Sequence, residues 1–403
     1  MFGDPLLVDG VGLEELLIVL VKGVVVFGVM LVAVILMVWF ERKIIGDFQN
    51  RVGPNMAGPF GILQTLADGI KLIFKEDLIP SRADRLVFGL APFLAMVPAF
   101  VSFGIVPLGG DFQESGGVVS WFGRDTYLQL ADPPVGILVL LAMSSIGVYG
   151  MMLAGWSSGS KYPLLGSVRA SAQAISYEAA LGLSLVSVIL VSGSLSTHDI
   201  VASQAGEGFF GFVPNWNILI TGVVPFVIFL IAAAAELNRS PFDLVEAEQE
   251  LVGGVHTEYS SIRFGHFYLA EYMNLITMSA IMATLFLGGP AGPIFGPGFL
   301  HPVLPIVWMF LKVLAFLFLA IWTRGTLPRF RYDQLMDLGW KVLIPLSLGW
   351  LLLLTAIRIG NDRDWNTGLI VGVAVLVFAA GAGLLASAFA TARRERLAEE
   401  VSS

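Results

Sequence analysis

Several acidic residues of this chain lie within or at the ends of long apolar stretches, where carboxylates are rare. Glu178 stands where one long apolar stretch begins, and Glu271 lies about one turn inside another. An unpaired carboxylate in hydrocarbon is costly, so such an acid is expected to face protein or a water-filled cavity. A desolvated carboxyl titrates nearer neutrality, which suits proton transfer. For Glu178 the alternative is an acid that complements the dipole at a helix start.

The densest group of acids lies in one predicted loop, residues 236–258. Its only basic residue is Arg239, so the loop is strongly acidic with His256 neutral. The acids are Glu236, Asp243, Glu246, Glu248, Glu250 and Glu258. Neighbouring carboxylates share protons, because the charge of each changes the proton affinity of the others. The pattern also suits an acidic docking face for a basic partner, and the two interpretations are compatible.

Three smaller groups could also do chemistry. At the inner end of the first apolar stretch, snorkelling explains the basic residues of Glu41-Arg42-Lys43 but not the acid. Asp68 lies in a segment, 62–74, whose apolar residues recur at helical spacing. Residues 324–331 contain three arginines, which could anchor the chain at the membrane face or pair with the acidic loop.

Long apolar blocks must position these residues. The chain has 403 residues, of which 56% are hydrophobic and 13% charged, whereas soluble domains carry about 25% charged residues. A helix needs about 20 apolar residues to cross a bilayer. We therefore expect an all-α polytopic membrane protein with about nine transmembrane helices, near 15–39, 86–108, 134–155, 177–193, 217–235, 267–289, 302–323, 342–360 and 368–390. Prolines within 86–108 predict a kink there.

The distribution of basic residues predicts the orientation. With the N-terminus outside and the C-terminus inside, most of the 23 basic residues lie in inner loops and the tail, and the outer loops hold Arg124, Arg358 and Arg363. Segment 62–74 then becomes an amphipathic helix on the inner face. We expect one membrane domain over 1–360, followed by an additional helix and charged tail over 361–403.

Composition excludes several classes of site. The absence of cysteine excludes thiolate-ligated iron–sulfur clusters, thiolate zinc sites and disulfides. No predicted helix carries two of the four histidines along one face, so bis-histidine haem is not expected. We expect no metal site, no redox centre and no catalytic residue in this chain alone. We also expect no cleavable signal peptide, because a basic region and a small-residue cleavage site are missing.

Taken together, these motifs resemble the H subunit of bacterial NADH-quinone oxidoreductase (respiratory complex I), the equivalent of mitochondrial NADH dehydrogenase subunit 1. The likeness runs from about residue 15 to 360 and is carried, in order, by Glu41-Arg42-Lys43, Gly53-Pro54-Asn55, Ala67-Asp68-Gly69, Ser176-Tyr177-Glu178, 235–243, 246–259, Ala270-Glu271-Tyr272 and 329–335. Departures are the long outer loop 109–133, Gln249 where serine is common, and the additional C-terminal helix and tail.

The resemblance implies a membrane protein that joins the membrane and hydrophilic arms of the complex in the bacterial plasma membrane. Quinone would be its substrate, and FMN and iron–sulfur clusters would belong to partner subunits. The resemblance assigns to the quinone chamber Arg42, Asp68, Tyr268, Glu271, Tyr272, Arg324 and Arg329. It assigns to a proton-coupling acidic funnel Glu178, Glu236, Glu246, Glu248, Glu250 and Glu258. Glu41 is added to the proton-relay candidates on the local argument above.

Two other functions stay open. A related protein that anchors a membrane-bound hydrogenase would keep the fold and lack the quinone. A stand-alone ion carrier would place its binding residues at broken helices near mid-membrane and often shows an internal repeat. The acids here gather toward the inner face, and the sequence has no evident repeat. Expected partners are the other subunits of the complex, membrane lipids and quinone, and not nucleic acid.

Overall fold

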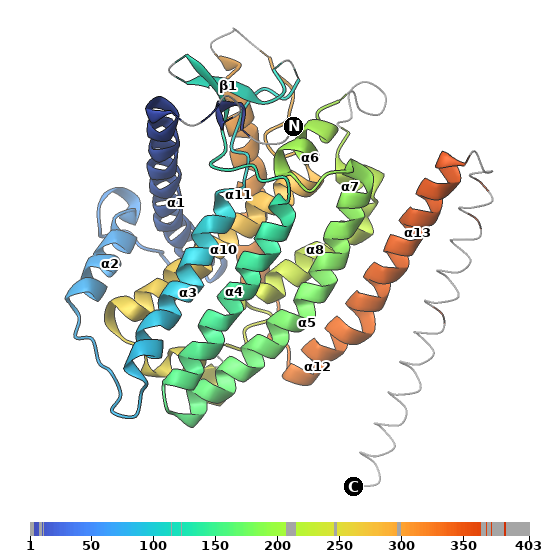
Figure 1. The fold of residues 1–403 in the computed structure, drawn as a ribbon. Helices are drawn as coiled ribbons and strands as arrows, with labels where there is room; N and C mark the ends of the chain where they lie inside the picture. Colours follow the sequence, from blue (N-terminus) through green and yellow to red (C-terminus); the bar gives the residue numbers. More distant parts are fainter. Residues whose placement is uncertain are drawn as a thin grey trace.

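The protein is a bundle of long apolar helices with one small antiparallel sheet (Figure 1). The computed structural model describes residues 4–7, 10, 12–113, 115–121, 123–206, 215–245, 248–295 and 300–363, with Gly368, Gly372 and Gly383. Its elements are η1 (Pro5–Leu7), α1 (Leu13–Phe48), η2 (Pro59–Gly61), α2 (Gln64–Phe74), α3 (Arg85–Phe103), β1 (Val118–Trp121), β2 (Arg124–Tyr127), α4 (Gly136–Ser157), α5 (Lys161–Ser192), α6 (Thr197–Gln204), α7 (Asn217–Ile220), α8 (Val223–Glu236), α9 (Glu248–Leu251), η4 (Gly254–Glu258), α10 (Ser261–Phe286), α11 (Leu304–Thr326), α12 (Tyr332–Asp337), η6 (Leu338–Leu343) and α13 (Ile344–Asp362).

The polytopic all-α architecture is confirmed for the described part of the chain. Seven helical segments there are long and apolar enough to cross a membrane: α1, α3, α4, α5, α10, α11 and the continuous run Tyr332–Asp362. α8 is a shorter apolar helix. These eight correspond to the first eight predicted spans. The ninth, 368–390, and the tail lie outside the described residues apart from isolated glycines, and the orientation stays a prediction.

Three helix boundaries differ from the sequence prediction. α5 begins at Lys161 rather than near residue 177. Its first half is polar because it packs against protein: a Cβ on Gly166 would lie 3.1 Å from Gly254 Cα. α10 likewise begins at Ser261, before residue 267. The predicted span 217–235 is interrupted at Gly222, whose φ of +83° favours glycine.

α10 runs through the middle of the bundle (Figure 1), where α3 packs against it and α1 and α11 contact it. In its most apolar stretch 83% of the residues are buried, against 28% in α1 and 11% in the Tyr332–Asp362 run. α4, α5 and α8 form a contiguous layer beside it. A helix enclosed on all sides holds its side chains firmly, so residues on α10 have fixed positions.

α2 confirms the helix predicted over 62–74. It packs against α1 and α10, and Thr65 Oγ1 donates a hydrogen bond to Ile35 O of α1 at 3.2 Å. Ser261 Oγ at the start of α10 donates to Leu72 O at 2.9 Å. None of its residues is buried, so its apolar side chains remain available to a membrane surface, as an amphipathic helix requires.

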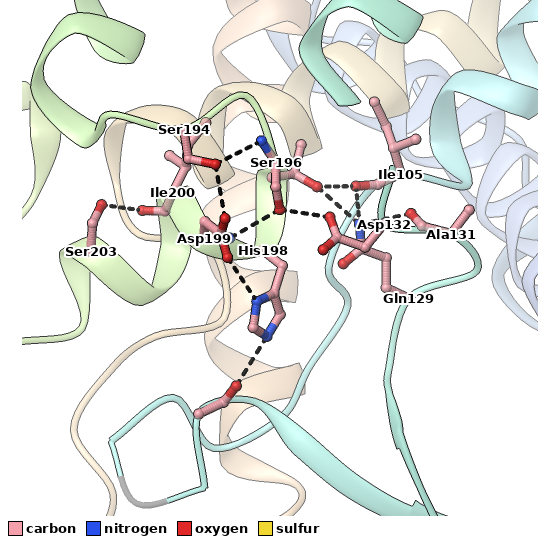
Figure 2. A network of polar contacts seen from close by, with 12 residues as sticks. Ile105, Gln129, Ala131, Asp132, Ser194, Ser196, His198, Asp199, Ile200 and Ser203 are labelled. Atoms are coloured by element: carbon pink, nitrogen blue, oxygen red, sulfur yellow. Dashed lines mark hydrogen bonds and ion pairs between the residues drawn. The ribbon is translucent and has the colours of Figure 1, made fainter. Parts of the chain in front are cut away.

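A polar network ties together the loops at the opposite end of the bundle, where the N-terminus and β1 lie (Figure 1). Figure 2 shows Ser196 Oγ donating to Asp132 Oδ1 at 2.7 Å and Gln129 Nε2 donating to Ile105 O at 2.7 Å. In the same network the ring of His198 lies 3.0 Å from Gly116 O. The loop 109–133 is therefore anchored to α6 through His198.

Candidate functional site

Arg239 is the centre of the charged cluster. It follows α8, is 7% exposed, and its Nη2 lies 3.0 Å from Glu41 Oε2 while its Nε lies 2.6 Å from Glu271 Oε1. Its guanidinium carbon is 4.5 Å from the centre of the Tyr272 ring, and Arg324 forms a second ion pair with Glu41. Burial disfavours the charged guanidinium, but Glu271 and Glu41 raise the pKa of Arg239 above its usual value. Two arginines and two glutamates thus neutralise one another where α1, α10 and α11 meet the segment after α8.

A cavity of about 140 Å³ opens beside this cluster. Four predicted chamber residues line it, namely Tyr268, Glu271, Tyr272 and Arg324, together with Glu236, Arg239, Asp243, His256, Asn274, Thr277 and Ser144. Ligand pockets are typically about 300–1,000 Å³, so this space alone is too small for a bound headgroup. One water needs about 10–15 Å³ of such volume, so several waters fit.

Buried polar atoms without protein partners point to water in this cavity. Glu236 Oε2, Arg239 Nη1 and Thr277 Oγ1 are buried and have no hydrogen-bond partner among the described residues. A buried donor or acceptor left unsatisfied costs about 1–3 kcal/mol. All three residues line the cavity, and waters placed there would satisfy them.

Glu236 and Glu178 form a second acidic site on α8 and α5. Ser144 Oγ of α4 donates a hydrogen bond to Glu236 Oε1, and Ser145 Oγ donates to Glu178 Oε1 at 2.5 Å. Because α5 begins at Lys161, Glu178 is far from the first turn of its helix. The interpretation of Glu178 as an acid that complements a helix dipole is therefore wrong.

Only part of the acidic loop is described. Glu250 Oε2 of α9 lies 2.6 Å from Arg169 Nη1 of α5, and Glu258 is half-buried in η4. Glu246 and the side chain of Glu248 lie outside the described residues. Two of the three arginines in 324–331 pair outside the acidic loop: Arg324 at the end of α11 pairs with Glu41, and Arg331 pairs with its neighbour Asp333.

Gln173 of α5 fixes the start of the acidic loop. It is fully buried, and its Nε2 donates to Ala235 O at 2.6 Å and to Phe242 O at 2.8 Å. The same nitrogen lies 3.3 Å from Asn238 Oδ1. One side chain therefore holds both ends of the short segment that carries Glu236 and Arg239.

His256 of η4 lies at the cavity among aromatic rings. Its ring centre is 5.4 Å from Phe267 and 6.0 Å from Tyr268. Burial lowers the pKa of His256, although Glu271 and Asp243 act in the opposite direction. The imidazole is therefore neutral at physiological pH and can both donate and accept a proton in a hydrogen bond.

The remaining predicted chamber residues lie away from the cavity lining. Arg42 of α1 and Asp68 of α2 pair with each other at 2.7 Å. Partial burial raises the pKa of Asp68, but Arg42 and Lys71 lower it more, so that it falls below its usual value. Arg329 is half-buried after α11, and its Nη2 has no hydrogen-bond partner among the described residues. The chamber assignments therefore stay predictions, with four of the seven residues gathered at one cavity.

Sequence reasoning missed four side chains that the structure places at the site. They are Arg239, Ser144, Ser145 and Gln173. Arg239 carried a signal, because it is the lone base in a strongly acidic loop. The serines and the glutamine carried none, since their types are ordinary in apolar helices and their partners lie on other helices.

Comparison with known proteins identifies relatives over most of the chain. A family model described as NADH dehydrogenase matches residues 21–355. The H subunit of NADH-quinone oxidoreductase from Frankia alni is 52% identical over 377 residues, which cover 93% of this chain and 80% of the relative. An H subunit from Koribacter versatilis, numbered 2, is 52% identical over 347 residues, covering 83% of this chain and 94% of the relative. The H subunit from Cutibacterium acnes is 45% identical over 405 residues, covering 96% and 88%.

Proposed function

Because the chain belongs to the NADH dehydrogenase family and its relatives are named as H subunits of NADH-quinone oxidoreductase, we propose that it is a membrane subunit of a proton-translocating NADH:quinone oxidoreductase in the bacterial plasma membrane. In this proposal it forms part of the quinone chamber and couples quinone reduction to proton movement. It carries no redox centre itself. FMN and iron–sulfur clusters belong to the hydrophilic partner subunits, and quinone is the substrate.

The cavity beside Arg239 is the observation that carries the proposal. Its lining includes Glu271, Tyr272 and Arg324 of the charged cluster together with Glu236. Reduction of a quinone to a quinol takes up protons as well as electrons. Waters in the cavity between the charged cluster and Glu236 can conduct protons between these groups when quinone reduction takes protons up.

The size of the cavity limits what this chain does alone. About 140 Å³ holds several waters but no headgroup. The headgroup site in the proposal is therefore completed by a neighbouring subunit above Tyr268 and Tyr272, whose rings and hydroxyls suit a flat polar ring. This chain supplies one wall of that site and the cavity next to it.

The relatives' names favour this function over its alternatives. A hydrogenase anchor would share the fold, but the matched relatives are named as quinone oxidoreductase subunits. A stand-alone carrier needs a substrate site at mid-membrane. Arg239, Glu271 and Arg324 at the described cavity are instead held in ion pairs, with Arg239 between Glu41 and Glu271.

Replacing one cavity carboxylate in the assembled complex tests the proposal. Glu271→Gln should lower NADH:quinone activity, because it removes the partner of Arg239 at the cavity. NADH:ferricyanide activity, which needs only electron entry through partner subunits, should persist. Glu14→Gln is the control, since that side chain is 76% exposed at the far end of α1. Full quinone reduction by Glu271→Gln would contradict the proposal.

A further inference from the structure

Two consecutive serines on α4 make hydrogen bonds that are unusual for serines inside a helix. Ser144 donates to Glu236 of α8, and Ser145 donates to Glu178 of α5 at 2.5 Å. Serines in helix interiors often donate to a carbonyl of the preceding turn. Ser184 donates in this way to Leu181 O at 2.7 Å, and Ser279 donates to Leu275 O at 2.8 Å. The single proton of each α4 hydroxyl is therefore committed to a carboxylate.

The geometry of a helix explains why adjacent residues reach two different acids. Successive side chains are about 100° apart around a helix with 3.6 residues per turn. α4 packs against α5, which carries Glu178, while Ser144 lies on the face of α4 that lines the cavity with Glu236. The pair consequently has one hydroxyl at the cavity and the other toward α5.

Each carboxylate accepts a hydrogen bond from one of these serines. Glu236 Oε1 accepts from Ser144, and its Oε2 has no hydrogen-bond partner among the described residues. Hydrogen bonding to an ionised carboxylate favours the ionised form, and desolvation disfavours it. Ser144 therefore favours a negative charge at Glu236, whereas burial and the nearby carboxylate of Glu178 disfavour it. Ser145 in turn holds Glu178 of α5 through its hydrogen bond to Oε1.

We propose that Ser144 and Ser145 are positioning residues that fix Glu236 and Glu178, and that Ser144 sets the pH range in which Glu236 exchanges protons. This inference rests on the proposed function, since it concerns proton transfer through the same site. Each hydroxyl keeps its own proton in the resting arrangement. A proton arriving from a cavity water binds Glu236 Oε2, and Ser144 keeps the other oxygen in place.

Substitution in the assembled complex tests the proposal through the pH profile. Ser144→Ala should move the profile of coupled NADH:quinone activity to higher pH by about one unit, the shift that about 1.4 kcal/mol produces, and Ser145→Ala is tested beside it for proton translocation. Proton translocation per NADH oxidised should fall by more than the quinone-reduction rate. Ser184→Ala is the control, because it removes a buried hydroxyl that bonds only within its own helix.

An isosteric pair separates positioning from packing. Threonine and valine have the same shape and differ by the hydroxyl, so Ser144→Thr should retain the wild-type profile and Ser144→Val should show the shifted one, even if alanine prevents assembly. Equal profiles for Thr and Val, or alanine variants that pump protons like the wild type, would overturn the inference. A wild-type complex that shows no proton-coupled quinone reduction would instead overturn the proposed function.

Discussion

Arg239→Gln is the substitution on which the charge cluster can be tested most directly. Arg239 is the ion-pair partner of Glu271 at 2.6 Å and shares Glu41 with Arg324. The side chains of Arg239 and Glu41 are 7% and 3% exposed, so water screens the Arg239–Glu41 pair little. Removing one partner of a buried pair costs about 3–5 kcal/mol, because an uncompensated charge remains. Arg239→Gln should therefore lower the thermal-inactivation midpoint and the yield of assembled complex.

The control is an ion pair at the surface. Arg331 and Asp333 lie 3.4 Å apart with side chains 76% and 48% exposed, and water screens such a surface pair so strongly that it contributes little to stability. Arg331→Gln should change assembly little.

The double variant Arg239→Gln with Glu271→Gln supplies the sharper result. It removes both charges together, so its loss should be smaller than the sum of the two single losses by about 0.5–3 kcal/mol. Thermal inactivation of quinone reductase activity, measured for the wild type, the two single variants, the double variant and Arg331→Gln, gives the comparison. Strict additivity, or an Arg239→Gln protein as stable as Arg331→Gln, would refute the view that these charges depend on one another.

Three further predictions concern the surroundings of the cavity. Gln173→Leu removes the donor that holds Ala235 O and Phe242 O, so hydrogen–deuterium exchange over 236–245 should rise, whereas Gln49→Leu at the exposed end of α1 should not change it. Because burial lowers the pKa of His256, the unfolded chain binds a proton there more readily, and stability should fall as pH drops below about 6.5. His256→Asn should weaken this pH dependence, measured as thermal inactivation between about pH 5.5 and 7.5. An unchanged dependence would exclude His256 as its source. Asp68→Asn breaks a partly exposed pair with Arg42, so assembly should be unaffected. A raised KM for quinone with little change in kcat would place Asp68 on the quinone path. An unchanged KM would remove Asp68 from the chamber.

The bundle was largely predictable because apolar length is the physical requirement for crossing a membrane. Eight predicted stretches correspond to eight helices in the described part of the chain. The errors occur where helices are buried in protein rather than in lipid. The first half of α5 is rich in small and polar residues, and Gly166 there allows close contact with Gly254. Hydropathy records lipid contact, so it could not reveal that half of the helix.

The site was predictable only where charge made a residue conspicuous. Glu236 and Glu271 stood out because a carboxylate in an apolar segment needs a reason, and the structure places both at one cavity. Ser144 and Gln173 bond to groups 92 and 62 residues away in sequence. No local pattern encodes such pairings, because they follow from the order in which α4, α5 and α8 pack.

The segment between Glu236 and Arg239 links the two halves of the site. Glu236 ends α8, and Asn238 turns the chain with a φ of +52°, a conformation that asparagine tolerates better than most residues. Arg239 follows directly and holds Glu41 and Glu271. α10 is enclosed by other helices, and Gln173 of α5 holds the turn by a hydrogen bond. Glu236 and Arg239 therefore have little freedom to move independently of each other. A change of charge at Glu236 therefore acts on Arg239 through the electric field across the cavity and through the backbone that joins the two residues. In the proposed function, this pair links a proton step at Glu236 to the charged cluster around Arg239.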